Sequence, residues 1–471
     1  MATTAAYNTF RRVYSNPEDE QHRAAFTSRR GVYALRWAYY NNSVFDDLAT
    51  WQSYKGAYRL YRFTRSIYNP AKRLINFYTG SLYPGRLSTE PNQPSAIPLN
   101  EATPQALRTA IAEVWRASNW QSNKGVTVRF GSALGETLIE IIDDAERGQV
   151  YLQNTWPGMV SDLDLDAMGN VKAYTLEYDA IDEDDKAYKY KKVVTGQSFA
   201  EFRDDKQIAS YANPYGFVPA CWIIHCDEGG DFGSPAMRNL SKWDELNGMA
   251  SHAHDQIHKQ LKAPVLLAGT GFSNAASQAK AGASEDNPTK QESIDLITGS
   301  AESSMQTLQL AGLDQVIPYV EKLLGEIESD HPELTFYQQL REMSQVTGPA
   351  AQRLMGDVQA LVMDAQANYD QQLIKAFQMA VAIGGWRLSQ GDWGPAVNRQ
   401  QEAYRGFDLE SYRRGDLDFS IDERPLIPVT EKEQLELDRM RLALENDRQG
   451  LNEQNQPQAI AARLRGARVP A

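Results

Sequence analysis

The N-terminal part of the chain has the apolar spacing of helices. Apolar residues recur at three- and four-residue steps over 27–40 and 57–82, and Pro70 is expected to bend or break the second segment. After a proline-rich loop, a third helix is predicted over about 104–118, with Thr103 as its N-cap.

The middle of the chain changes to short runs in which apolar and polar residues alternate. Glycine, asparagine and aspartate separate these runs, as expected of turns between strands. The predicted strands are 126–130, 137–142, 150–153, 171–178, 188–194 and 220–226. We therefore expect a β-rich module between helical segments.

Two further helices, predicted over 235–261 and 313–327, flank an interval of small residues. This interval, 263–310, is rich in Ala, Gly, Ser and Thr. It contains short β-type pieces at 265–267, 294–297 and 305–308. A long insertion between two helices normally projects outward and carries function or disorder.

The most regular apolar stripe covers residues 349–383. A helix of this length would span ~50 Å, which suits an element that bridges layers of an assembly. A Gly/Trp region at 384–394 is expected to end it, and a strand at 417–421 and a capping box from Thr430 to Glu433 follow. The fold class predicted from these patterns is α+β and mainly helical.

Charge is distributed unevenly along the 471 residues. The net charge is -13, yet residues 1–90 carry 13 Lys and Arg against 6 Asp and Glu. The rest of the chain is therefore strongly acidic and would repel DNA phosphates, so a DNA partner would be conducted and not gripped. Ordinary solubility explains an acidic surface equally well.

Composition argues against several other classes. No apolar run approaches the ~20 residues of a membrane span, and the first residues lack the pattern of a secretory signal, which favours assembly in the cytoplasm. The two cysteines, Cys221 and Cys226, are expected to be buried, reduced thiols.

Motifs for catalysis are weak. His254 and His258 stand one helical turn apart and differ from a zinc-peptidase pattern by Asp255 in place of glutamate, without an evident third ligand. The residues from Asp162 resemble the start of a calcium-binding loop, but the twelfth position is Ala173, which cannot ligate the ion. We find neither a phosphate-binding loop nor a serine elbow. The sequence therefore predicts no enzyme activity and no cofactor, with a zinc hydrolase as the alternative.

Several ordered segments resemble the siphophage-type portal proteins of tailed bacteriophages. The matching segments are 69–80, 166–178, 213–219, 231–235, 346–354 and 416–428. The most specific is Asn213-Pro214-Tyr215-Gly216-Phe217-Val218-Pro219, followed by Asp231-Phe232-Gly233-Ser234-Pro235 and a helix. Pro349 departs from the family, in which a Ser-Gly-Glu-like run is commoner at this point.

The resemblance implies a ring, usually of twelve subunits, at one capsid vertex of the virion. Double-stranded DNA would pass through the ring during packaging and ejection. The terminase large subunit, which drives packaging, and later a head-tail adaptor protein would dock on the clip, and the major capsid and scaffold proteins on the wing. Another structural virion protein, such as a scaffold or capsid subunit, remains an alternative.

The resemblance also implies a portal-type division of the chain. The segments are an N-terminal arm (1–26), wing (27–235), first stem helix (236–262), clip (263–310), second stem helix (311–328), tunnel-loop region (329–348), long wing helix with its return (349–428) and helical crown (429–471).

Channel residues are expected on the stem helices and in the tunnel-loop region. Acidic side chains there would keep the duplex from sticking, and lysines would make transient phosphate contacts. The candidates are Lys242, Asp244, Glu245, Lys259, Lys262, Glu321, Lys322, Glu326, Gln345 and Thr347. For any one of them, a surface ion pair is the competing interpretation.

Overall fold

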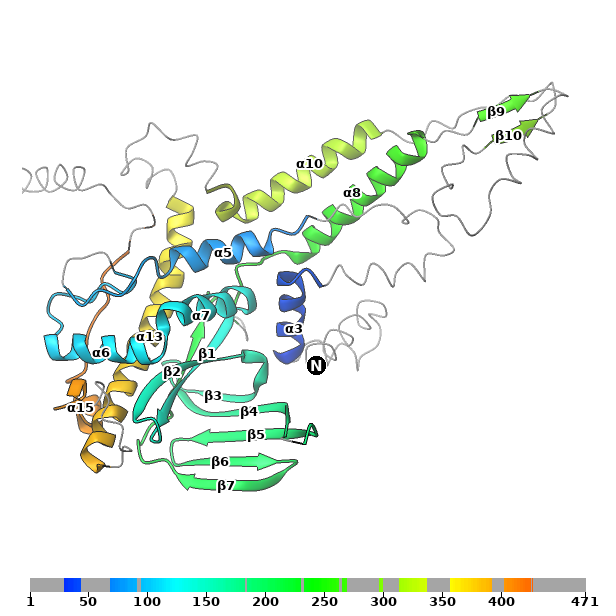
Figure 1. Cartoon of the computed structure of the whole chain (residues 1–471). Coiled ribbons are helices and arrows are strands. Elements are labelled where there is room, and N and C mark those ends of the chain that lie inside the picture. The colour runs from blue at the N-terminus through cyan, green and yellow to red at the C-terminus, as the bar shows by residue number, and fades with distance from the viewer. Residues whose placement is uncertain are drawn as a thin grey trace, which may run out of the picture.

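A computed structural model describes most of the chain between residues 29 and 426. The described residues are 29–43, 68–90, 95–182, 184–229, 233–261, 265–268, 296–299, 313–336, 356–391, 402–424 and 426. They form a mixed α+β fold in which a broad body carries a projecting arm of two helices (Figure 1). The expected N-terminal arm and crown, most of the clip, and residues 337–348 of the tunnel-loop region lie outside the described residues.

Helices form one layer of the body. They are α3 (Arg29–Tyr40), α5 (Ala71–Ser81), α6 (Gln105–Ala117) and α7 (Trp120–Leu134). Pro70 is the N-cap of α5, which confirms the break expected there. The expected N-cap at Thr103 is wrong, because Pro104 takes that position, and the buried Thr103 hydroxyl has no hydrogen-bond partner among the described residues.

Two antiparallel sheets form a second part of the body. β1 (Glu136–Asp144) lies between β2 (Gln149–Thr155) and β8 (Ala220–Ile224). The second sheet is a five-stranded meander in chain order, drawn at the bottom of Figure 1. Its strands are β3 (Val160–Leu165), β4 (Val171–Ile181), β5 (Ala187–Thr195), β6 (Ser198–Arg203) and β7 (Lys206–Ala212). β8 carries the buried Cys221, and the half-buried Cys226 follows it; both are free thiols.

The strand expected at 126–130 is wrong, since these residues lie within α7. Val126, Val128 and Phe130 do alternate with other residues, as in a strand with one buried face. However, the adjacent residues Thr127 and Val128 are both buried, which does not fit that pattern. Contacts of α7 with α5 and β1 therefore overrode the local β pattern. The strands β3, β6 and β7 were missed because they are largely polar and half-exposed, as in β7, where six of seven residues are exposed.

The long helix α13 (Gly356–Gln390) runs through the region that was expected to end it. A Cβ atom at Gly385 would lie 2.0 Å from the Phe407 carbonyl oxygen, and one at Gly384 would lie 2.5 Å from the Tyr404 ring. These glycines serve close packing against residues 402–409, and they do not terminate the helix. The strand expected at 417–421 is also wrong, because only an isolated bridge between Ile421 and Leu99 forms there.

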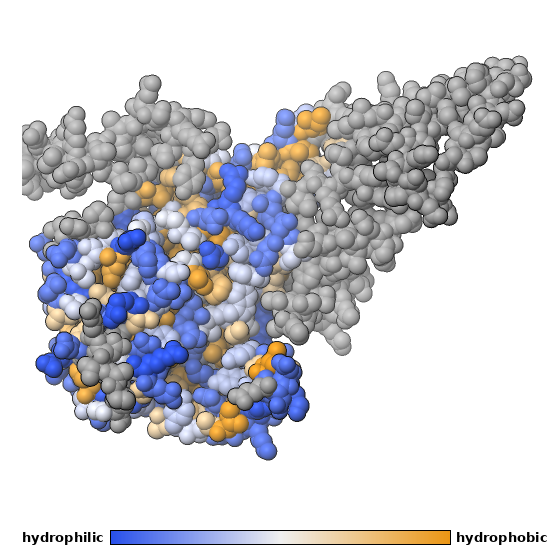
Figure 2. All heavy atoms as spheres, viewed as in Figure 1, coloured by the Kyte–Doolittle hydropathy of each residue, from blue (hydrophilic) through white to orange (hydrophobic). Residues whose placement is uncertain are grey.

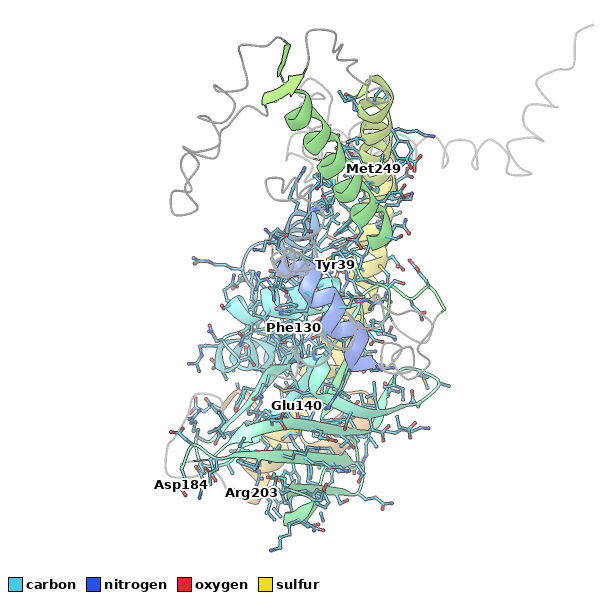
Figure 3. The ribbon with its side chains drawn as sticks, turned by 90° about the vertical axis from the view of Figure 1, so that its right-hand side faces the viewer. Tyr39, Phe130, Glu140, Asp184, Arg203 and Met249 are labelled. Atoms are coloured by element: carbon cyan, nitrogen blue, oxygen red, sulfur yellow. The ribbon has the colours of Figure 1, made fainter. Side chains whose placement is uncertain are left out.

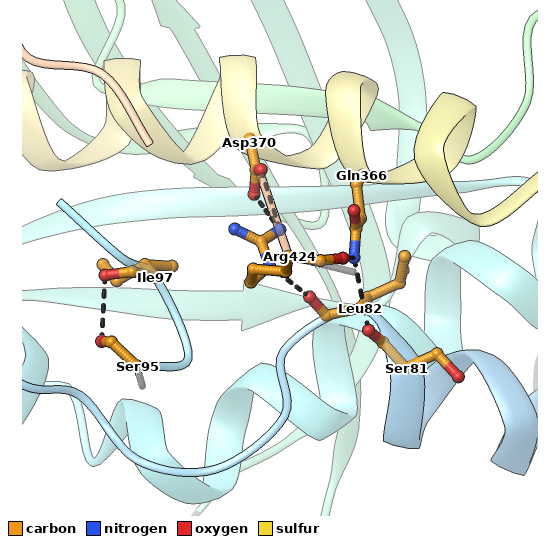
Figure 4. Close-up of polar contacts among 7 residues, drawn as sticks. All are labelled: Ser81, Leu82, Ser95, Ile97, Gln366, Asp370 and Arg424. Carbon is orange, nitrogen blue, oxygen red and sulfur yellow. Dashed lines mark hydrogen bonds and ion pairs between the residues drawn. The ribbon is translucent and has the colours of Figure 1, made fainter. Parts of the chain in front are cut away.

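A buried ion pair attaches the segment after α15 (Leu409–Arg414) to α13. The Arg424 guanidinium donates two hydrogen bonds of 2.8 Å to Asp370, and its Nε donates to the Leu82 carbonyl, which follows α5 (Figure 4). Gln366, one turn earlier on α13, reaches the carbonyls of Ser81 and Arg424. This clamp joins three segments that are far apart in the sequence.

The projecting arm consists of α8 (Leu240–Leu261) and α10 (Leu313–Asp330), which lie side by side (Figure 1). At its far end, β9 (Val265–Ala268) pairs in parallel with β10 (Leu296–Gly299). The second predicted helix and the short strands near 265–267 and 294–297 are confirmed. The first predicted helix is confirmed from Leu240, five residues later than its predicted start at 235. The β-type piece at 305–308 lies outside the described residues.

Glycine substitutions test the close packing of α13. Gly385→Ala should lower the free energy of unfolding by about 2 kcal/mol, because its methyl group meets the Phe407 backbone. Gly325→Ala, on α10, meets no atom within 4 Å and should be neutral or stabilising by up to about 1 kcal/mol. Urea unfolding of both variants measures the difference; equal effects would contradict this account of α13.

Candidate functional site

The root of the arm is an ionic and hydrogen-bonded cluster that we define as Arg238, Lys242, Asp330, His331 and Glu333. The Lys242 ammonium lies 2.7 Å from the Asp330 carboxylate, at the end of α10, and 3.9 Å from Glu326. Since Lys242 belongs to the first turn of α8, this contact sets the two helices antiparallel. The hydrogen bond with Asp330 raises the pKa of Lys242, and Lys242 in turn lowers the pKa of Asp330.

Apolar residues at helical spacing hold the same helices. α8 buries Trp243 and Leu246, and α10 buries Leu323 and Ile327. The Trp243 ring is fully buried and lies edge-on to His331, with the ring centroids 5.7 Å apart. The root therefore combines a packed apolar seam with charges at its margin.

Glu333 is the most deeply buried charge of the root, with a fully buried side chain. Its carboxylate accepts hydrogen bonds from Tyr78 of α5, at 2.7 Å, and from Arg238, at 2.9 Å. His331 contacts the Arg238 carbonyl through Nε2 at 3.1 Å. Burial, together with the neighbouring Glu333 carboxylate, raises the pKa of Tyr78 well above its ordinary value. The root thus connects both arm helices to α5.

Other contacts hold α8 against the body. The Tyr39 hydroxyl, on α3, donates to Asp244 at 2.6 Å. Asn247 accepts from the backbone of Tyr68 at 2.6 Å and donates back to it at 3.1 Å. Figure 3 shows Met249 further out along α8 than these contacts. The first half of α8 is therefore seated in the body.

The predicted channel residues have different surroundings. Lys242, Glu326 and Lys322 form a ladder of ion pairs at the arm surface, with 3.9 Å between Lys322 and Glu326. Glu245 accepts a hydrogen bond from Tyr319 at 2.7 Å, and Glu321 is exposed.

Asp244 is not an open acid of the arm surface, because it faces Tyr39 and is half-buried. Burial raises its pKa, although the hydrogen bond from Tyr39 opposes the change. The Lys259 side chain lies outside the described residues, as do Lys262, Gln345 and Thr347.

Large apolar side chains remain exposed on α10. Ile317 is 47% and Tyr319 40% exposed. Figure 2 shows apolar surface on the part of the arm that is drawn in colour. Exposed apolar side chains gathered on a projecting element favour contact with another protein surface.

Sequence reasoning missed Arg238, Asp330 and Glu333. The predicted second helix ended at residue 327, whereas α10 continues to Asp330. The run Asp330-His331-Pro332-Glu333, with its charges beside a helix-ending proline, was the available signal. Its pairing with Arg238, 95 positions away, depends on the tertiary fold.

Metal and membrane motifs are not found within the described ranges. No group of three or more His, Cys, Asp or Glu side chains there could hold a metal ion. The side chains of His254 and His258 lie outside those ranges, so the zinc alternative is untested. None of the described helices is both long and apolar enough to cross a membrane.

No known protein-family model matches this chain, and no curated protein is significantly similar to it.

His225 forms a second buried polar position, between the body and the root. Its ring is fully buried, 4.6 Å from the Tyr78 ring and 5.8 Å from the Tyr369 ring by their centroids. Neither ring nitrogen has a hydrogen-bond partner among the described residues. Burial, with a smaller contribution from Arg238, lowers the pKa of His225 to about 3. The imidazole is therefore neutral at pH 7.

Removing the Arg238 charge should destabilise the root. Arg238→Met leaves the buried Glu333 carboxylate without its cation and should lower the free energy of unfolding by about 2 kcal/mol. Lys322→Met, a matched change at an exposed ion pair, should change it by less than about 0.5 kcal/mol. Chemical denaturation measures both variants, and a similar loss from both would refute the assigned importance of Glu333.

His225 should make stability depend on pH. Its pKa is lower in the folded than in the unfolded protein, so its contribution is complete above about pH 6.5 and declines as the pH falls toward 3. Each pH unit in that window should cost up to about 1.4 kcal/mol. His225→Phe should remove this part of the slope, whatever its effect at pH 7. Thermal unfolding of the wild-type and His225→Phe proteins from pH 7 to pH 4 measures this pH dependence. If the stability of both proteins fell with pH at the same rate, the prediction would be contradicted.

Proposed function

We propose that this chain is a portal-type subunit, which assembles into a ring that conducts double-stranded DNA. The observation that carries the proposal is the antiparallel helix pair. It projects from an α+β body, is fastened by buried charges at its root and holds a β pair at its far end (Figure 1). In this proposal α8 and α10 form the stem, the β9–β10 end is the clip, and the body with α13 is the wing.

The arm surface supports stacking of neighbouring subunits into a ring. Ile317 and Tyr319 would be covered by the next subunit, which removes their apolar surface from water. In a closed ring each subunit contacts its neighbours through two different surfaces, so every subunit would use this arm surface once. Twelve subunits are the expected number for this class of ring.

The charges of the arm support passage of DNA without tight binding. Glu245, Glu321 and Glu326 are acidic, and Lys322 partly neutralises Glu326. Binding to DNA strengthens with each phosphate that a free cation neutralises, so such a surface would grip a duplex weakly. This is what a conduit requires.

The proposal includes several partners and a location in the virion. The terminase large subunit and a head-tail adaptor protein would bind the clip end, and the major capsid and scaffold proteins the wing. The ring would occupy one vertex of the capsid.

Negative-stain electron microscopy of the purified chain tests the proposal. We expect rings of high rotational symmetry with a central opening that admits a duplex. Monomers or dimers that persist at high protein concentration and low salt would overturn it. A scaffold or shell protein would instead give irregular or shell-like assemblies, and metal analysis of the same sample would detect a zinc hydrolase.

A charge on the arm surface should prevent ring formation. Ile317→Asp places a carboxylate where the proposal requires an apolar contact between subunits. We expect the fraction of protein in rings to fall at least about tenfold, because an unpaired buried charge costs more than ~1.4 kcal/mol per contact. Ile208→Asp is the control, because Ile208 is similarly exposed but lies on β7, away from the arm. Rings that survive Ile317→Asp would remove the arm from the subunit contact.

A further inference from the structure

A cavity of about 430 Å³ lies between the central strand of the small sheet and one face of the five-stranded sheet. β1, the strands β4 to β7, the 214–219 segment and α13 contribute to its lining. Five aromatic rings line it: Tyr174, Tyr190, Phe199, Tyr211 and Tyr215. Its volume is in the range of pockets that bind small ligands or side chains.

Strand register explains why these rings gather. Tyr174 pairs with Val194, Val194 with Phe199, and Phe199 with Tyr211, so these side chains share one face of the sheet. The rings of Phe199 and Tyr211 stack with their centroids 5.1 Å apart. Tyr215 stands edge-on to Phe199 at 6.3 Å. The cavity is thus walled by aromatic faces and edges.

Two of its three carboxylates are already neutralised. Glu140 is 2.8 Å from the Lys192 ammonium and also accepts hydrogen bonds from Tyr174 and Thr155. Although burial opposes ionisation, these contacts lower the pKa of Glu140. Asp143 is 2.7 Å from Nε of Arg387. Neither acid needs a further cation.

Glu201 is the third carboxylate and differs from the other two. Within the described part of the chain, no cation lies at ion-pair distance from it, because its cross-strand neighbour Lys192 pairs with Glu140 instead. The Tyr211 hydroxyl lies 3.5 Å from the Glu201 carboxylate. Burial, with Glu201 next in effect, raises the pKa of Tyr190. The cavity therefore carries one negative charge that its own lining leaves uncompensated.

The cavity also has a spare acceptor. The Oδ1 atom of Asp143 is buried and has no donor among the described residues, whereas Oδ2 accepts from Tyr215 and Arg387. Buried acceptors are rarely left unpaired in folded proteins. An occupant that brings both a positive charge and hydrogen-bond donors would complement this lining.

We propose that the cavity binds the side chain of an arginine carried by an extended segment of a partner protein. The guanidinium is planar, stacks on aromatic rings and donates several hydrogen bonds, so it complements both the rings and the carboxylate of Glu201. This inference does not rest on the portal proposal, because the cavity belongs to the body and not to the arm.

Ligand-observed saturation-transfer NMR with the full-length protein tests the inference. The probe is N-acetyl-L-arginine amide, and its neutral isostere, N-acetyl-L-citrulline amide, is the control ligand. We expect binding of the arginine probe and at least about threefold weaker binding of the citrulline probe, since only the first pairs with Glu201. Equal binding of the two, or no binding of either, would overturn the proposal.

Variants locate the binding. Glu201→Gln should weaken the arginine probe at least about threefold, and Tyr211→Ala, which removes a half-exposed wall, should also weaken it. Glu177→Gln is the matched control, because Glu177 pairs with Lys191 on the opposite face of the sheet. Near-ultraviolet circular dichroism checks folding. An unchanged response of both cavity variants, or an equal loss with Glu177→Gln, would refute the assignment to this cavity.

Discussion

The fully buried carboxylate of Glu333 is the constraint on which the arm depends. A buried charge is costly unless it is paired and hydrogen-bonded, and Glu333 meets both needs only when Tyr78 and Arg238 are in place. Tyr78 comes from α5, Arg238 precedes α8, and Glu333 follows α10. If these segments separated, the Glu333 carboxylate would be left as an unpaired charge in the protein interior. The direction in which the arm leaves the body is therefore tied to one carboxylate.

The short helix α5 is the junction of the whole described structure. Tyr78 holds the arm through its hydrogen bond to Glu333. One turn further along the chain, the Ser81 carbonyl accepts a hydrogen bond from Gln366 of α13, and the Leu82 carbonyl accepts one from Arg424 (Figure 4). Asp370 completes the second clamp, and although burial raises the pKa of this acid, Arg424 opposes the change. A movement of the arm relative to α13 would have to disturb one of these two buried ionic contacts.

The surfaces proposed for function lie on different parts of this frame. The arm presents apolar residues beside partly neutralised charges, as expected of an element that packs against copies of itself and borders a conduit. The cavity beside Glu201 presents aromatic rings and an uncompensated charge, as expected of a pocket for one specific side chain. A subunit with a self-contact on one element and a pocket on another could join a ring and bind a separate partner at once.

The sequence by itself determined the elements whose apolar pattern was regular. Periodicity predicted α8, α10 and most of α13, and alternation predicted β1, β4 and β5, because burial of one face imposes the period. Tertiary contacts decided the rest. Residues 126–130 became helix because α5 and β1 cover them, and Gly384 and Gly385 stayed helical because Tyr404 and Phe407 pack against them. The partners of Asp244 and Glu333, and the pairing that leaves Glu201 uncompensated, join positions distant in the chain, and no local pattern encodes such contacts.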